Sequence, residues 1–174
     1  MEIFDLYDAK RRLTGETMVR GTPTPPERYR LVVHVCIFNS RGEMLIQQRQ
    51  PFKNTWPDLW DLTLGGCVVS GETSQMGAAR ELSEELGLAV DFSDMPPAFT
   101  VTFDGGFDDF YILERDVDIS DLRCQPEEVQ ALKWATLEEI LAMVDSGEFI
   151  PYHKGFLQFL FNRQNGRACL YSAQ

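Results

Sequence analysis

The sequence predicts an α+β protein, built as a three-layer α/β/α sandwich around a mixed sheet. Two observations favour this class: short β-branched runs occur in pairs separated by turns, and amphipathic helices follow without a regular βαβ alternation. The 174 residues suffice for one domain, and we expect a single one over 1–174. It divides into an extension at 1–27, a core at 28–148 and a helical segment at 149–174.

The expected elements follow in chain order. Strands are expected at 3–7, 31–38, 44–46 and 60–69, then a hairpin of 99–103 with 110–113, and a strand at 129–135. A helix begins after Thr73 or Ser74, which can cap it, and Gly87 ends it. Two further helices are expected at 136–144 and 154–163. Prolines between residues 21 and 26 make a stiff connector.

Composition limits the function. The formal net charge of −11 disfavours binding to a nucleic-acid polymer, although a divalent cation would let a small anion approach. The four scattered cysteines form no CxxC pair, so we expect reduced, packed thiols. No apolar run is long enough to span a bilayer and no signal peptide is evident, which predicts a cytoplasmic protein without membrane partners.

The helix after Thr73 carries the chemistry. Glu81, Glu84 and Glu85 stand at i, i+3 and i+4 and therefore share one face, while Ala79, Leu82 and Leu86 are expected to be buried on the other. Three carboxylates on an anchored helix provide the oxygen ligands that Mg²⁺ prefers. The alternative is a solvated acidic face in which Arg80 pairs with Glu84.

The flanking residues favour the metal site. The segment from Gly66 to Leu88 resembles the Nudix box, G-x5-E-x7-R-E-U-x-E-E-x-G-U, where U is a bulky aliphatic residue. Every required position is met, namely Gly66, Glu72, Arg80, Glu81, Leu82, Glu84, Glu85, Gly87 and Leu88. At about 7% per residue type, a chance match of the seven single-residue positions is on the order of 10⁻⁸ per start.

The resemblance implies the Nudix fold, an enzyme that hydrolyses diphosphates, and a role for each residue. Glu81, Glu84 and Glu85 would bind Mg²⁺ or Mn²⁺ together with the Gly66 carbonyl, and Glu72 would orient the carboxylates. Arg80, also mainly orienting, is counted with Glu81 and Glu84 as catalytic. Glu81 or Glu84 is the expected general base. Asp104, Asp108 and Asp109 are the candidates for a base supplied by a loop outside the box.

A second resemblance is to type I isopentenyl-diphosphate isomerase, which shares the fold. The run Leu45–Arg49, with Lys53, Trp56, Trp60 and Asp61 after it, carries this likeness. It implies that Arg49 and Lys53 contact substrate phosphate.

The departures from the isomerase matter more. Gly65 stands where that enzyme has its catalytic cysteine, Cys67 and Arg30 stand where it has metal-binding histidines, and the box is complete here. His34, inside a predicted strand, is expected to be a core histidine.

The leading hypothesis is a Mg²⁺-dependent hydrolase of a nucleoside diphosphate linked to a group X, or of a related organic diphosphate. An isomerase-like enzyme and a non-catalytic nucleotide sensor are the alternatives. Position 103 lacks the proline, and position 105 the tyrosine, that mark two Nudix subfamilies, so the substrate stays open. The family likeness implies a homodimer, and residues 1–27 are an expected specificity or dimer element.

Overall fold

The computed structural model describes residues 2–164 and divides the chain into two compact units. The first comprises the chain up to Val35 together with Leu64–Tyr111, and the second comprises Cys36–Thr63 together with the chain from Ile112 onward. The expected helical segment at 149–174 therefore lies partly outside the described residues, and Cys169 lies outside them. The strands β3 (Arg30–Phe38) and β8 (Gly106–Glu114) contribute residues to both units.

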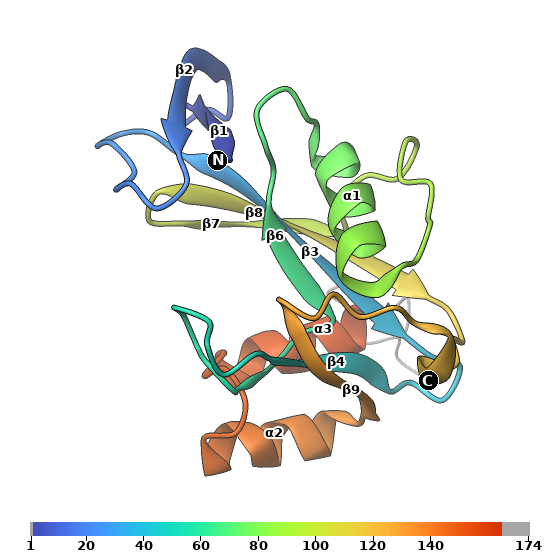
Figure 1. Cartoon of the computed structure of the whole chain (residues 1–174). Coiled ribbons are helices and arrows are strands. Elements are labelled where there is room, and N and C mark those ends of the chain that lie inside the picture. Colours follow the sequence, from blue (N-terminus) through green and yellow to red (C-terminus); the bar gives the residue numbers. More distant parts are fainter. Residues whose placement is uncertain (1, 165–174) are drawn as a thin grey trace, which may run out of the picture. The chain divides into compact units, whose positions relative to one another are not determined.

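In the first unit, the predicted strand β1 (Ile3–Tyr7) is confirmed, and it pairs antiparallel with β2 (Leu13–Val19). This hairpin, blue in Figure 1, buries Phe4, Leu6 and Met18, against which Cys67 and Val69 pack. The partner strand was missed because its exposed, mostly polar residues show little alternation. The extension before residue 28 is therefore a folded element.

The remaining strands of the first unit form a sheet. The strand β6 (Leu64–Cys67) pairs antiparallel with β3, which neighbours β8, and β8 pairs antiparallel with β7 (Phe99–Phe103). The second predicted hairpin is thus confirmed, but its returning strand begins at Gly106 because the turn needs only Asp104 and Gly105, with Gly105 at φ +81°.

The helix α1 (Ser74–Leu86) lies on β6 (Figure 1). Thr73 caps its start by accepting a hydrogen bond from the backbone N–H of Met76, and Gly87 ends it at φ +69°, as expected. The predicted burial needs correction. Ala78, rather than Ala79, is buried together with Leu82 and Leu86, and Glu85 is buried as well. Counted from Ala78, these residues stand at i, i+4, i+7 and i+8, which share one stripe of a helix.

In the second unit, β4 (Met44–Arg49) pairs antiparallel with the end of β3, with β5 (Trp60–Asp61) and with β9 (Val129–Ala135). The helices α2 (Leu137–Ser146) and α3 (Lys154–Gln164) confirm the two expected near the C-terminus, and a short 3₁₀ helix spans Ile119–Asp121. The predicted α+β class with a mixed sheet is therefore confirmed.

The strand expected at 60–69 is wrong as one element, since β5 and β6 are separate. In the intervening segment, the carboxylate of Asp61 accepts a hydrogen bond from the backbone N–H of Leu62. The hydroxyl of Thr63 accepts one from the N–H of Ile37, at 3.0 Å, and donates to the carbonyl of Leu45. These side chains replace ladder hydrogen bonds and so interrupt the strand.

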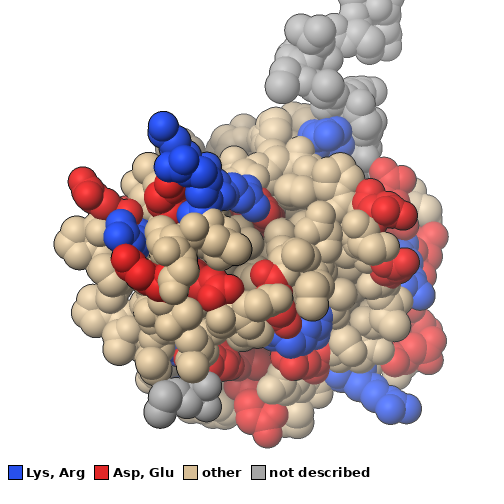
Figure 2. Space-filling view, turned by 90° about the horizontal axis from the view of Figure 1, so that it is seen from above, with Lys and Arg blue, Asp and Glu red and all other residues tan. Residues whose placement is uncertain are grey.

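The surface combines both signs of charge. Figure 2 shows Lys and Arg side chains interspersed with Asp and Glu on the face that it presents. No helix in the described part of the chain is both long and apolar enough to cross a lipid bilayer.

Candidate active site

The box residues come together in the first unit, on β6, the loop after it and α1. Gly66 lies in β6, Glu72 in the loop that leads to the helix, and Arg80, Glu81, Glu84 and Glu85 on α1. A Cβ atom on Gly66 would lie 2.1 Å from Cδ of Glu81, so only glycine leaves room for this carboxylate beside the strand. The box spacing thus packs the Glu81 carboxylate against the backbone of β6.

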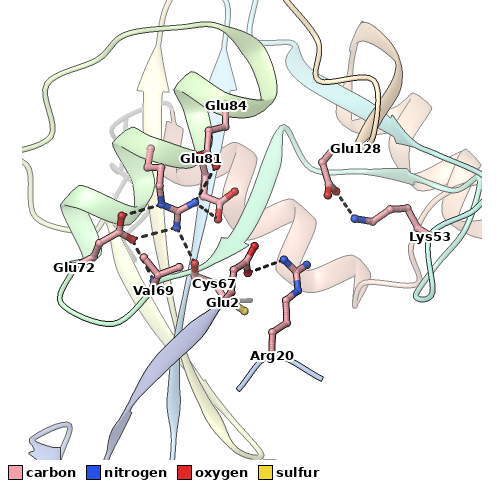
Figure 3. Close-up of polar contacts among 10 residues, drawn as sticks. Glu2, Arg20, Lys53, Cys67, Val69, Glu72, Glu81, Glu84 and Glu128 are labelled. Atoms are coloured by element: carbon pink, nitrogen blue, oxygen red, sulfur yellow. Dashed lines mark hydrogen bonds and ion pairs between the residues drawn. The ribbon is translucent and has the colours of Figure 1, made fainter. Parts of the chain in front are cut away.

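Arg80 makes the polar contacts that join β6, the loop and α1, and Figure 3 labels its partners Glu72, Cys67, Glu81 and Glu84. Its Nε and Nη2 donate to the two carboxylate oxygens of Glu72 at 2.8 and 3.1 Å, a bidentate pair. Its Nη1 donates to Glu81 at 2.9 Å and to Glu84 at 3.0 Å, and its Nη2 also reaches the Cys67 carbonyl at 3.0 Å. The guanidinium therefore ties the loop, the strand and the helix together.

The pairing of Arg80 with Glu84, which belonged to the alternative of a solvated acidic face, is present. Glu72 contacts Arg80, and its role in orienting the carboxylates stays a prediction. Glu72 also accepts a hydrogen bond from the backbone N–H of Val69, which holds the loop. The neighbouring carboxylates compensate the guanidinium charge. Burial acts to lower the pKa of Arg80, but hydrogen bonding to Glu72 and the charge of Glu81 outweigh burial and raise it.

The three helix carboxylates differ in environment. The side chain of Glu81 is 14% exposed and that of Glu84 is 53% exposed, while Glu85 as a residue is only 5% exposed. Burial raises the pKa of Glu81, and Arg80 opposes the shift. One face thus presents a half-buried and an exposed carboxylate, while Glu85 lies deeper in the packed stripe.

The donor set fits a hard divalent cation. Glu81 and Glu84 supply carboxylate oxygens, and Gly66, which lies against the Glu81 carboxylate, has a backbone carbonyl; both are ligand types that Mg²⁺ takes. Among the described residues, no three acidic, histidine or cysteine side chains stand close enough together to hold an ion. Arg80 instead draws Glu81 and Glu84 to itself.

A buried network under the start of α1 was missed by sequence reasoning. Asp109 is 0% exposed and accepts hydrogen bonds from Ser74, the first residue of α1, and from Thr100, both at 2.6 Å. Arg11, from the turn between β1 and β2, donates to both oxygens of Asp109. Tyr111 shares a hydrogen bond with Ser74 at 2.8 Å.

The expectation that Asp108 and Asp109 lie in a loop is wrong, because both belong to β8. Asp109 is enclosed by the network just described. Asp108 pairs with Nδ1 of His34 at 2.8 Å, and the His34 ring stacks on Phe110. The expected core histidine is thus largely buried and bonded within the sheet. Asp104 lies in the turn before β8.

The β1–β2 hairpin also forms hydrogen bonds with the box loop, the segment between β6 and α1. The carboxylate of Asp5 accepts hydrogen bonds from the Ser70 hydroxyl, at 2.6 Å, and from the Gly71 N–H, at 2.8 Å. The Ser70 N–H donates to the carbonyl of Ile3 at 2.8 Å. No local sequence signal connects these residues, which stand more than sixty positions apart.

Arg49 and Lys53, the expected phosphate contacts, belong to the second unit. Arg49 donates to the Thr55 carbonyl at 3.2 Å and pairs with Asp61 at 3.4 Å, and Lys53 pairs with Glu128. Both side chains are largely buried in these pairs. Their role at the substrate stays a prediction.

The residues at the isomerase positions do not reproduce its chemistry. A Cβ atom on Gly65 would lie 2.4 Å from Nε2 of His34, so the histidine ring occupies the space that a cysteine side chain would need. Burial raises the pKa of the Cys67 thiol, which packs beside the hairpin core. Cys36 is also buried, and Cys124 is half-buried.

Comparisons with known proteins agree with this architecture. Residues 28–157 match the NUDIX domain family. An uncharacterized Nudix hydrolase of Listeria monocytogenes is 48% identical over 165 residues, which cover 95% of this chain and 96% of that protein. The crystal structure of DR0079 from Deinococcus radiodurans superposes with a TM-score of 0.74 at 28% identity, covering 93% and 98% of the two chains.

The chain therefore belongs to the Nudix family, and the prediction of a Nudix hydrolase with the Nudix fold is confirmed. The likeness to the isomerase has weaker support. An isopentenyl-diphosphate Delta-isomerase of Nocardia farcinica is 32% identical over 91 residues, about half of each chain.

Proposed function

We propose that the protein is a divalent-metal-dependent hydrolase that cleaves a diphosphate bond in a nucleoside diphosphate-X or a related organic diphosphate. The observation that carries this proposal is the complete box, in which Arg80 contacts Glu72, Glu81 and Glu84, and the Glu81 carboxylate lies beside Gly66. The proposal rests on carboxylates that a second layer of hydrogen bonds orients, as metal sites require.

Each residue has a role in this proposal. Glu81, Glu84 and Glu85 with the Gly66 carbonyl would hold Mg²⁺ or Mn²⁺. When bound, the metal would neutralise the diphosphate, polarise a phosphorus–oxygen bond and lower the pKa of the attacking water. Glu81 or Glu84 would accept the proton of that water, and Arg80 would keep both carboxylates aimed. Glu84 is the most exposed of the three carboxylates.

The test is turnover of a panel of diphosphates by the purified chain with Mg²⁺. Nucleoside triphosphates, sugar nucleotides and isopentenyl diphosphate are incubated with the wild type and with Glu84→Gln, and products are identified by mass. We expect hydrolysis of at least one compound, lost on chelation and reduced 10- to 100-fold in Glu84→Gln.

Glu138→Gln is the matched control, because Glu138 is exposed on α2 and belongs to no box position. Isomerised isopentenyl diphosphate without hydrolysis would instead support the isomerase alternative. Tight binding of one compound without turnover would support the sensor alternative.

A further inference from the structure

The box loop contains a β-turn whose central residues lie at the surface. The backbone N–H of Glu72 closes the turn by donating to the Val69 carbonyl at 3.1 Å. Gly71, the third residue of the turn, has φ +87°, a conformation that favours glycine there. Ser70 and Gly71 are both exposed, so the turn has little packing of its own at its centre. Its conformation therefore depends on hydrogen bonds from other segments.

The donors of the two central residues bind to β1. The Ser70 N–H donates to the Ile3 carbonyl at 2.8 Å. The Ser70 hydroxyl and the Gly71 N–H donate to the two different carboxylate oxygens of Asp5, at 2.6 and 2.8 Å. One side chain of the hairpin therefore contacts both central residues of the turn.

Asp5 is itself fixed by the packing of its neighbours. Phe4 and Leu6, on either side of it in β1, are buried in the hairpin core. Val69, the first residue of the turn, packs against the same core. The hairpin therefore supports the turn both by apolar contact and by the carboxylate of Asp5.

The turn leads directly to the polar contacts of the box. Glu72, its last residue, accepts a hydrogen bond from the Val69 N–H at 3.2 Å and a bidentate pair from Arg80 at 2.8 and 3.1 Å (Figure 3). Arg80 in turn donates to Glu81 and Glu84. A shift of the turn would move Glu72, and with it the carboxylate that pairs with Arg80.

We propose that Asp5 is a positioning residue for the metal site: its carboxylate fixes the turn, and the turn fixes the Glu72–Arg80 pair that contacts the box carboxylates. The inference rests on the proposed function, because it concerns how ready those carboxylates are to bind a metal ion. It gives the N-terminal hairpin a part in the reaction, although Asp5 lies far outside the box, which begins at Gly66.

The first measurement requires no metal. Nuclear magnetic resonance follows the exchange of the Arg80 Nε–H with water, which reports on the pair between Arg80 and Glu72. We expect exchange about tenfold faster in Asp5→Ala than in the wild type, because the turn loses two hydrogen bonds that hold it.

The second measurement is Mn²⁺ affinity, obtained from the electron paramagnetic resonance of the free ion. Asp5→Ala should bind Mn²⁺ about tenfold more weakly, the lower end of the effect that partners of metal ligands have. In Asp5→Asn the amide oxygen can accept from the Gly71 N–H while the amide N–H donates to the Ser70 hydroxyl, so affinity should stay within about threefold of wild type.

Asp8→Asn is the matched control, because it is the same substitution on the same hairpin and Asp8 pairs with Arg12. It should equal the wild type in both measurements. Thermal melts confirm that each variant is folded at the temperature used. In a variant that is folded, a residue with a purely structural role would leave the Mn²⁺ affinity unchanged.

Four outcomes would overturn the inference. They are wild-type Arg80 exchange in Asp5→Ala, wild-type Mn²⁺ affinity despite faster exchange, equal losses in Asp5→Asn and Asp5→Ala, and no Mn²⁺ binding by the wild type. Equal losses would mean that Asp5 acts by its charge and not by its hydrogen bonds.

Failure of the proposed function gives a different result. If Asp5→Ala shows both losses but the wild type hydrolyses none of the diphosphate panel, the positioning role stands and the hydrolase proposal fails. If the wild type hydrolyses a compound and Asp5→Ala matches it in Mn²⁺ affinity and turnover, the hydrolase stands alone.

Discussion

Replacing Arg11 tests whether the hairpin supports the start of the box helix. Arg11→Met removes the only cationic partner that the described residues give to Asp109, which is 0% exposed. Breaking a buried ion pair on one side costs about 3–5 kcal/mol, because a charge is left buried and uncompensated. The side chain of Arg11 is 35% exposed, so we expect the lower end, about 3 kcal/mol.

The double variant isolates the cause. In Arg11→Met/Asp109→Asn no charge is buried. Ser74 and Thr100 donate to different oxygens of Asp109, so the amide oxygen can accept from one of these hydroxyls while the amide N–H donates to the other. We therefore expect a loss of only about 1 kcal/mol relative to wild type, which is about 2 kcal/mol less than the loss in Arg11→Met alone.

The assay must report on the first unit. All three tryptophans lie in the second unit, so urea unfolding is followed by circular dichroism together with amide exchange in α1. Arg12→Met is the control on the same turn. A single variant within 0.5 kcal/mol of wild type, on the usual scale for surface substitutions, would refute the reasoning. A double variant less stable than Arg11→Met would refute it as well.

Three further substitutions test the site. Gly66→Ala places a methyl group against the Glu81 carboxylate, so we expect a loss of activity of about 100-fold with an unchanged circular dichroism spectrum; normal turnover would contradict this packing. Gly65→Cys should lose about 1–3 kcal/mol of stability against the His34 ring and gain no isomerase activity, measured by unfolding and by product analysis. Asp5→Ala removes two hydrogen bonds to the box loop, so faster amide exchange there is expected, and exchange at the wild-type rate would show that the hairpin does not hold the loop.

The arrangement of the box residues could be predicted from the sequence because it is local. The box fits within one helix and the loop before it, so residue spacing decides which side chains share a face. Thr73 and Gly87 define the ends of α1 by backbone chemistry that is itself local. The same holds for β1, β9 and the hairpin turn at Gly105, where short-range patterns coincide with the elements formed.

Tertiary structure decided what lies around that helix. Glu85 is buried although it belongs to the acidic triplet, because the packed stripe of α1 includes it. Asp109 accepts hydrogen bonds from Arg11, which lies 98 positions away in the sequence, and no periodic pattern of residues predicts a contact over that distance. Asp61 and Thr63 interrupt a β-rich run because their side chains take over backbone hydrogen bonds.

The sequence by itself therefore determined the family and the helix that carries the box residues, since these depend on spacing along the chain. The folded chain decided how a hairpin from the first twenty residues anchors the box loop, and which groups meet under the start of α1. These depend on contacts between segments far apart in the chain, and the geometry of such contacts is set only when the chain packs.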